Sequence, residues 1–145
     1  MDVDKLLQAL ENDQNSFLLD LTTKKMHKVT EKVLKELHLP KETFKDYTNK
    51  LKQYHYIDDL SHLTHGSFIR CIPISDPDKI ELKNGCLLCD IKVVDEGISL
   101  LCKGFGPYTR HFQIKFDEHL IFQKLTSQEL VMLSAMDYLD SESDA

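Results

Sequence analysis

The chain has 145 residues, 41% of them hydrophobic, which suffices for one globular domain or two very small ones. Its net charge of -6 argues against binding nucleic acid by bulk electrostatic attraction, and no apolar run approaches the roughly 20 residues that cross a bilayer. The acidic start MDVDKLLQALENDQ lacks the apolar region of a signal peptide, so with four cysteines we expect a soluble, intracellular protein with free thiols.

Residues 1–60 are predicted to form a helical segment. The first amphipathic helix is indicated by apolar residues at helical spacing, namely Val3, Leu6, Leu7 and Leu10. A second helix is expected to begin near Thr22 or Thr23 and to end at HLP, because the residue before a proline avoids the helical region. Pro40 then suits the first turn of a third helix.

The two later helices are rich in lysine. Residues 24–55 contain nine lysines against four acidic residues, a charge of +5, while the rest of the chain carries -11. These lysines either solvate two helix faces or form a docking face for an anionic partner. Residues 33–57 also resemble winged-helix DNA-binding domains in spacing, with the next hairpin as the wing, although Thr48 and His55 depart from that pattern. This interpretation assigns nucleic-acid contacts to Lys41, Lys45, Asn49 and Lys52.

From Gly66 the pattern changes to strands. The segment SFIRCIPI at 67–74 is rich in β-branched and aromatic residues, and TRHFQIKF at 109–116 alternates, with Phe112, Ile114 and Phe116 expected inward. HLIFQKL at 119–125 follows an acidic turn. Short strands joined by tight turns predict a small antiparallel β-sheet or an SH3-like barrel.

The last element is predicted to be a capped helix. TSQE at 126–129 fits a capping box, in which Thr126 and Glu129 bond each other's backbone amides. The expected fold is therefore α+β, with N-terminal helices, a small sheet or barrel and a capped C-terminal helix. We expect residues 1–60 as the helical segment, 61–140 as the sheet with its helix, and 141–145 as an acidic tail.

Three of the four cysteines lie in CLLCDIKVVDEGISLLCKG at 86–104, which predicts a β-hairpin turning at Glu96-Gly97. In that register Val94 faces Ser99, and Leu87, Cys89 and Ile91 share one apolar face. Cys86 and Cys89 then point to opposite faces, which disfavours a zinc knuckle or a redox pair. We expect the cysteines to be small buried hydrophobic residues.

No motif for catalysis or for phosphate, dinucleotide or metal binding occurs in the chain. His62 and His65 have the i, i+3 spacing of a metal-binding pair, but a junction loop more often uses histidines as solvated or capping residues. The sequence therefore predicts a protein that is not an enzyme and has no cofactor or metal.

The candidate partner-binding residues lie in two places. The loop KGFGPYTRHF at 103–112 displays Phe105, Tyr108 and Arg110 between two strands. Aromatic and basic side chains on such a loop stack on bases, anchor a protein partner, or simply close the end of a barrel. Arg70 has the parity of Phe68 and Ile72, so it is either buried with an acidic partner or faces a ligand.

Several short motifs occur between roughly residues 50 and 140, namely YHYIDDL with GSFIR, NGCLLCDIK, and IFQKL leading into the capped helix. In these motifs the chain resembles a group of small uncharacterised proteins of large nucleocytoplasmic DNA viruses. Cys71 stands where that group has a large aromatic residue. The resemblance implies a viral protein that acts in the host cytoplasm or the virion, and it carries over no catalytic residues.

The first functional interpretation is a non-catalytic binding module that contacts protein partners, within a viral assembly if the resemblance holds. Its contact residues would be Arg70, Phe105, Tyr108 and Arg110. The alternative is a nucleic-acid-binding protein that uses either the lysine-rich helices or the aromatic-basic loop. The sequence leaves the oligomeric state and the identity of any partner open.

Overall fold

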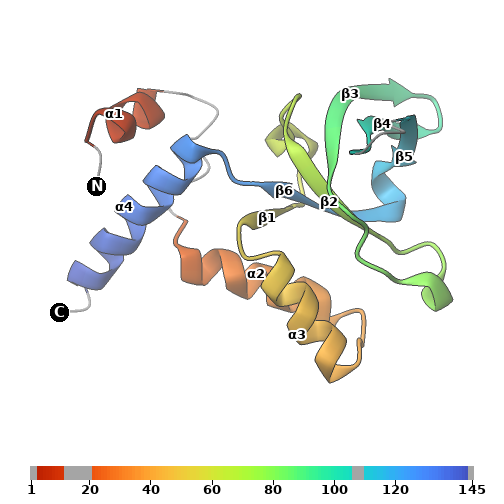
Figure 1. The fold of residues 1–145 in the computed structure, drawn as a ribbon, viewed down its shortest axis with the longest axis horizontal. Helices are drawn as coiled ribbons and strands as arrows, with labels where there is room; N and C mark the ends of the chain where they lie inside the picture. Colours follow the sequence, from red (N-terminus) through yellow and green to blue (C-terminus); the bar gives the residue numbers. More distant parts are fainter. Residues whose placement is uncertain (1–2, 12–20, 106–109, 144–145) are drawn as a thin grey trace. The chain divides into compact units, whose positions relative to one another are not determined.

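The computed structural model describes residues 3–11, 21–105 and 110–143, and the chain forms two compact units (Figure 1). The first unit combines residues 1–44 with 125–145, and the second is the continuous segment 45–124. The sequence suggested a boundary near residue 60 instead. The units differ from it because the strand Tyr54–Ile57 joins the sheet and because the C-terminal helix packs against the N-terminal one.

The first unit is helical in its described part. Its helices are α1 (Val3–Glu11), α2 (Thr23–Lys35) and α4 (Ser127–Ser143), and α3 (Lys41–Lys50) begins in it. Helix α1 packs on α4, where Ala9 and Met132 are buried together, while Met26 of α2 is buried with Leu125 and Leu133. None of the described helices is both long enough and apolar enough to cross a membrane.

At the start of α2, side chains accept hydrogen bonds from backbone N–H groups that have no partner within the helix. The N-cap residue Thr22 accepts a hydrogen bond from the Lys25 amide at 3.2 Å. Asp137 of α4 accepts two more, from the Thr23 amide at 2.7 Å and the Thr23 hydroxyl at 2.5 Å. A carboxylate at this position also complements the positive end of the helix dipole. Asp137 therefore joins α4 to the N-terminus of α2.

The predicted capping box at the start of α4 is confirmed. The Thr126 amide donates to Glu129 Oε1 at 2.8 Å, and the Glu129 amide donates to Thr126 Oγ1 at 3.2 Å. Glu129 is buried, and that burial raises the pKa of its carboxyl group above the usual value. The helix continues to Ser143, into the segment expected to be an acidic tail.

The second unit is built on one antiparallel sheet of six strands, so the expected α+β class is confirmed. The strands are β1 (Tyr54–Ile57), β2 (Phe68–Pro73), β3 (Cys86–Val94), β4 (Gly97–Lys103), β5 (His111–Lys115) and β6 (His119–Lys124). Their order is β1-β6-β2-β3-β4-β5, and β1 and β5 form the two edges of the pairings described. The described pairings thus confirm the small antiparallel sheet, in which β1 and β5 are not paired with each other.

The β3–β4 hairpin forms as predicted, but its register differs. Val94 pairs with Gly97 rather than with Ser99, so Asp95 and Glu96 make the turn. Gly97 has a φ of +126°, whereas neither turn residue has a positive φ. A turn of two residues with negative φ followed by a glycine with positive φ is a common hairpin connection. The glycine thus follows the turn instead of occupying it.

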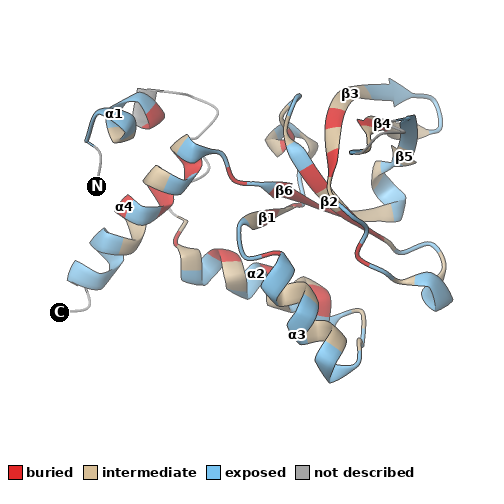
Figure 2. Ribbon diagram, in the orientation of Figure 1, coloured by how far each residue is buried: buried red, intermediate tan, exposed pale blue. Residues whose placement is uncertain are grey.

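A β-bulge between Leu88 and Asp90 corrects the predicted hairpin faces. The extra residue, Cys89, reverses the alternation of side chains, so Cys86 and Leu88 face the core in place of Leu87 and Cys89. Figure 2 marks the buried positions along the strands, which include those on this core face. This face contains most of the core of the second unit, namely Ile57, Ile69, Cys71, Cys86, Leu88, Leu100, Cys102 and Ile121.

The connections of β1 argue against the winged-helix interpretation. A wing requires that the strand after the recognition helix pair with the next strand along the chain. Here β1 pairs with β6, and β2 pairs with β6 and β3, so no wing follows α3 in the described residues. The side chains assigned to DNA in that interpretation, Lys41, Lys45, Asn49 and Lys52, are exposed.

Candidate functional site

The candidate site lies on the outer face of the sheet, opposite the core face. Strand register places one side chain of each strand in a transverse row there. Tyr54 pairs with Lys124, Phe68 pairs with Leu87, and Leu87 and His111 both pair with Lys103. Phe68 is next to Lys124, since the neighbouring pair is Ile69 with Gln123. Alternation along each strand therefore brings aromatic and basic side chains together.

Two exposed phenylalanines meet at the centre of this row. The ring centroids of Phe68 and Phe105 are 5.3 Å apart and their planes are tilted by 52°. The Lys124 Nζ atom lies 6.0 Å from the centroid of the Phe68 ring, at the limit for a cation–π contact. Phe68 is 42% exposed and Phe105 is 61% exposed, so much of the aromatic surface faces solvent.

Arg70 adds a fixed cation to the same face. It lies two residues beyond Phe68 on β2, and its Nε donates a hydrogen bond to the Lys83 carbonyl oxygen at 3.0 Å. That bond uses one of the five guanidinium donors. Burial of the Tyr54 phenol raises its pKa, and the nearby charge of Arg70 offsets only part of this rise. We call Phe68, Arg70, Lys103, Phe105 and Lys124 the outer patch.

The structure brings together part of the set predicted from the sequence. Phe105 and Arg70 both belong to the outer patch, because Phe68 connects the loop after β4 to β2. Arg110 is exposed at the start of β5, and Tyr108 lies outside the described residues. The acidic partner considered for Arg70 is replaced by a backbone carbonyl group.

Phe68 and Lys124 were missed as site residues. The sequence predicted both residues to lie in strands. The only signal that could have pointed to them was their position in the alternation of the strand, which decides the face of the sheet on which each lies. Phe68 shares the parity of Arg70 and Lys124 falls opposite Tyr54, but only the strand order shows that they are neighbours.

In the row that holds Arg70, one step along the strands from Phe68, the middle side chain is buried. Phe122 pairs with both Tyr56 and Arg70, and its side chain is fully buried. The rings of Tyr56 and Phe122 are 5.6 Å apart. Among the described residues, the open aromatic surface of this face therefore lies at the Phe68 and Phe105 end.

On the core face, a buried glutamine joins β6 to the loop before β2. Gln123 Oε1 accepts hydrogen bonds from the Thr64 amide and the Ser67 hydroxyl, both at 2.9 Å. Its amide nitrogen lies 3.1 Å from the His62 carbonyl oxygen and 3.4 Å from His55 Nε2. Because an amide nitrogen can only donate, His55 Nε2 accepts and the ring is neutral in this arrangement.

Three of the cysteines also meet on the core face, on strands β2, β3 and β4. Hydrogen bonding from the thiols of Cys102 and Cys71 lowers the pKa of Cys86 below the usual value. Hydrogen bonding to Cys86, together with burial, raises the pKa values of Cys71 and Cys102 well above the usual range. All four cysteines are free thiols, and Cys89 is the half-buried one. Cys71, Cys86 and Cys102 fill the core as expected, whereas Cys89 does not.

The described residues contain no group of three or more His, Cys, Asp and Glu side chains arranged to hold a metal ion. His62 and His65 do not converge. His62 Nδ1 lies 4.0 Å from Asp58 Oδ1, and His65 Nε2 lies 3.6 Å from Asp90 Oδ1.

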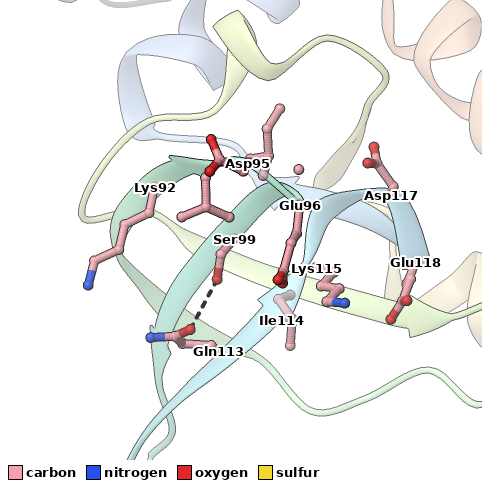
Figure 3. A pocket seen from close by; sticks show the side chains of 12 residues that line it. Lys92, Asp95, Glu96, Ser99, Gln113, Ile114, Lys115, Asp117 and Glu118 are labelled. Carbon is pink, nitrogen blue, oxygen red and sulfur yellow. Dashed lines mark hydrogen bonds between the residues drawn. The ribbon is translucent and has the colours of Figure 1, made fainter.

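A pocket at the far end of the β3–β4 hairpin is acidic (Figure 3). Carboxylates of the turn and of the short 3-10 helix η4 (Phe116–Glu118) line it, with Ser99 Oγ bonded to Gln113 Oε1 at 3.3 Å. The carboxylates belong to Asp95, Glu96, Asp117 and Glu118, with Lys92 and Lys115 also in the lining. The hairpin end and the outer patch therefore differ in charge.

Comparison with known proteins adds no relative to this geometry: no protein-family model, curated protein or solved structure matches the chain.

Proposed function

We propose that the protein is a non-catalytic binding module and that the outer patch is its contact surface. The observation that supports this proposal is the exposed pair of Phe68 and Phe105 with Lys124 beside it. Folding alone gives no reason to keep two large rings in contact at the surface, and clustered exposed apolar groups commonly mark interaction sites. Aromatic side chains next to arginine are also typical of the residues that dominate binding energy.

The positive charge of the outer patch indicates which kind of partner it would bind. Arg70, Lys103 and Lys124 supply three cations, and no member of the patch is acidic. Residues 45–124 as a whole have eleven basic and eleven acidic residues, so the excess of positive charge is local to the patch. An anionic partner is favoured, and both an acidic protein segment and a nucleic acid meet that condition. If the viral resemblance holds, this partner belongs to the infected cell or the virion.

The contacts of two histidines support a binding role rather than a catalytic one. His55 is buried and accepts from Gln123, and His119 Nδ1 lies 2.8 Å from the Lys115 carbonyl oxygen. A carbonyl oxygen can only accept, so His119 Nδ1 carries the proton. Both rings thus serve the packing and turns of the sheet.

Binding of two labelled anionic probes tests the proposal. One is an acidic peptide that contains tyrosine, and the other is a single-stranded oligonucleotide. We expect saturable binding of at least one probe in fluorescence anisotropy, weakened about tenfold or more by Phe68→Ala. Phe112→Ala is the matched control, because Phe112 is also 42% exposed but pairs with Cys102 on the core-face side. The proposal fails if neither probe binds, or if both variants weaken binding equally.

A further inference from the structure

We infer that the ligand of the outer patch is single-stranded nucleic acid, with one base stacked on the Phe68 and Phe105 rings and phosphates held by the flanking cations. This inference rests on the proposed function and names the ligand class.

The first support is the combination of aromatic and basic groups. Base stacking on aromatic side chains in a positively charged groove is how sheet proteins bind single strands without a sequence requirement. The ring centroids of Phe68 and Phe105 are 5.3 Å apart, yet the two residues stay 42% and 61% exposed. Ring surface therefore remains open to a base. In duplex nucleic acid the bases are already stacked, so this surface favours unpaired bases.

The second support is the placement of the cations along the row. Lys124 lies on β6, one strand from Phe68, and Lys103 lies on β4, two strands away on the other side. Neighbouring strands are about 4.8 Å apart, so the two ammonium groups flank the rings at a distance that long side chains span. Arg70, which its bond to the Lys83 carbonyl holds in place, offers further donors for a phosphate. A backbone that crosses the strands would thus meet a cation on each side of a stacked base.

The third support distinguishes a nucleic acid from an acidic peptide. An acidic peptide chiefly needs cations, whereas the outer patch also presents two adjacent exposed rings. A planar base can stack on exposed rings without being enclosed, whereas a peptide side chain that dominates binding usually fills a desolvated pocket. The observations therefore favour the nucleic acid, and the peptide is an outcome of the test.

The test uses the full chain and four labelled probes: 15-nucleotide single strands of dT and of rU, a 15-base-pair duplex, and the acidic tyrosine peptide. We expect both single strands to bind more tightly than the duplex. Phe68→Ala and Phe105→Ala should each weaken single-strand binding by about 5- to 150-fold, the range for losing one stacked base. Phe112→Ala should leave it unchanged.

Salt dependence tests the cation contacts separately. With about three phosphate contacts, the slope of log K against log salt should be about -2 for a single strand, a loss of about 20-fold between 50 and 200 mM salt. Lys124→Gln should reduce this slope by about 0.7, whereas Lys79→Gln, an exposed lysine off the sheet, should not. Thermal unfolding of each variant confirms that it folds.

Three results would overturn the inference. Binding of the acidic peptide but not of the single strands, with the same loss in Phe68→Ala, would keep the binding module and reassign its ligand. Single-strand binding that heparin displaces equally well from the wild type and from Phe68→Ala would reduce the contact to charge alone. Absence of binding to all probes would remove the proposed function as well.

Discussion

At the scale of single residues, the surroundings of His55 constrain its protonation. It lies on β1 with 4% of its surface exposed, and Gln123 donates to its Nε2. Burial, with a smaller contribution from His62, lowers the pKa of His55 from 6.5 to about 4. A neutral ring is therefore part of the folded structure, and protonation would place a charge among buried groups.

Acid should destabilise the protein through His55. Its pKa is lower in the folded chain, so the unfolded chain binds more protons between pH 4 and pH 6.5. This contribution to the unfolding free energy is fully present above about pH 6.5 and is lost as the pH falls towards 4. The loss amounts to about 2.5 kcal/mol at pH 4.5.

Urea unfolding at pH 7.5 and pH 4.5 measures this loss by comparison with His55→Gln, which does not titrate. The difference in unfolding free energy between the two pH values should be smaller in the variant by about 2 to 3 kcal/mol. Carboxyl groups such as Glu129 titrate in both proteins and cancel in the comparison. Equal pH dependence in wild type and variant would show that His55 is not held neutral.

At the scale of elements, the capping box of α4 should contribute measurably to stability. Thr126→Ala removes the acceptor of the Glu129 amide and should lower the unfolding free energy by about 1 kcal/mol, measured by urea unfolding at pH 7. Ser127→Ala is the control, because Ser127 is an exposed neighbour just inside the helix. A loss in Ser127→Ala as large as in Thr126→Ala would mean that the cap is not the cause.

Local elements of this protein were predictable, and their pairing was not. The capping box depends on residues three apart, so TSQE suffices to predict it. The hairpin was also predicted, but its register was wrong, because a glycine that follows a turn and one that occupies it look alike in sequence. The bulge at Cys89 leaves no sequence signal of its own, yet it decides which side chains face the core.

The candidate site follows the same rule. Phe105 and Arg70 were found from local composition and parity. Phe68 became a site residue only through its contact with Phe105, which lies 37 positions along the chain. Such a contact depends on β3 lying between β2 and β4, an order that one sequence does not specify.

At the scale of the whole molecule, the order of the strands makes the sheet non-local. β6, the last strand, lies between β1 and β2, the first two. The first unit is likewise assembled from both ends of the chain, since α1 packs on α4. The core clusters described in the two units share no residue: one includes Cys71, Cys86 and Cys102, and another joins Ala9 to Met132.

Thiol reactivity should therefore report on the second unit alone. In the native protein we expect Cys89, which is half-buried, to react with a disulfide reagent such as DTNB before the other three, because access limits a buried thiol whatever its pKa. Leu100→Ala, in the core of the sheet, should lower stability by about 2 to 5 kcal/mol and speed the reaction of the buried thiols.

Met132→Ala is the matched change in the first unit. Met132 is 1% exposed, so its truncation should lower the unfolding free energy by a similar amount. We expect it to weaken the helical signal in circular dichroism at low urea while the three buried thiols keep their protection. If it instead exposes those thiols as much as Leu100→Ala does, the two units unfold together. Separate cores would then not mean separate stability, and the covalent chain connections after residues 44 and 124 would have to couple the two units.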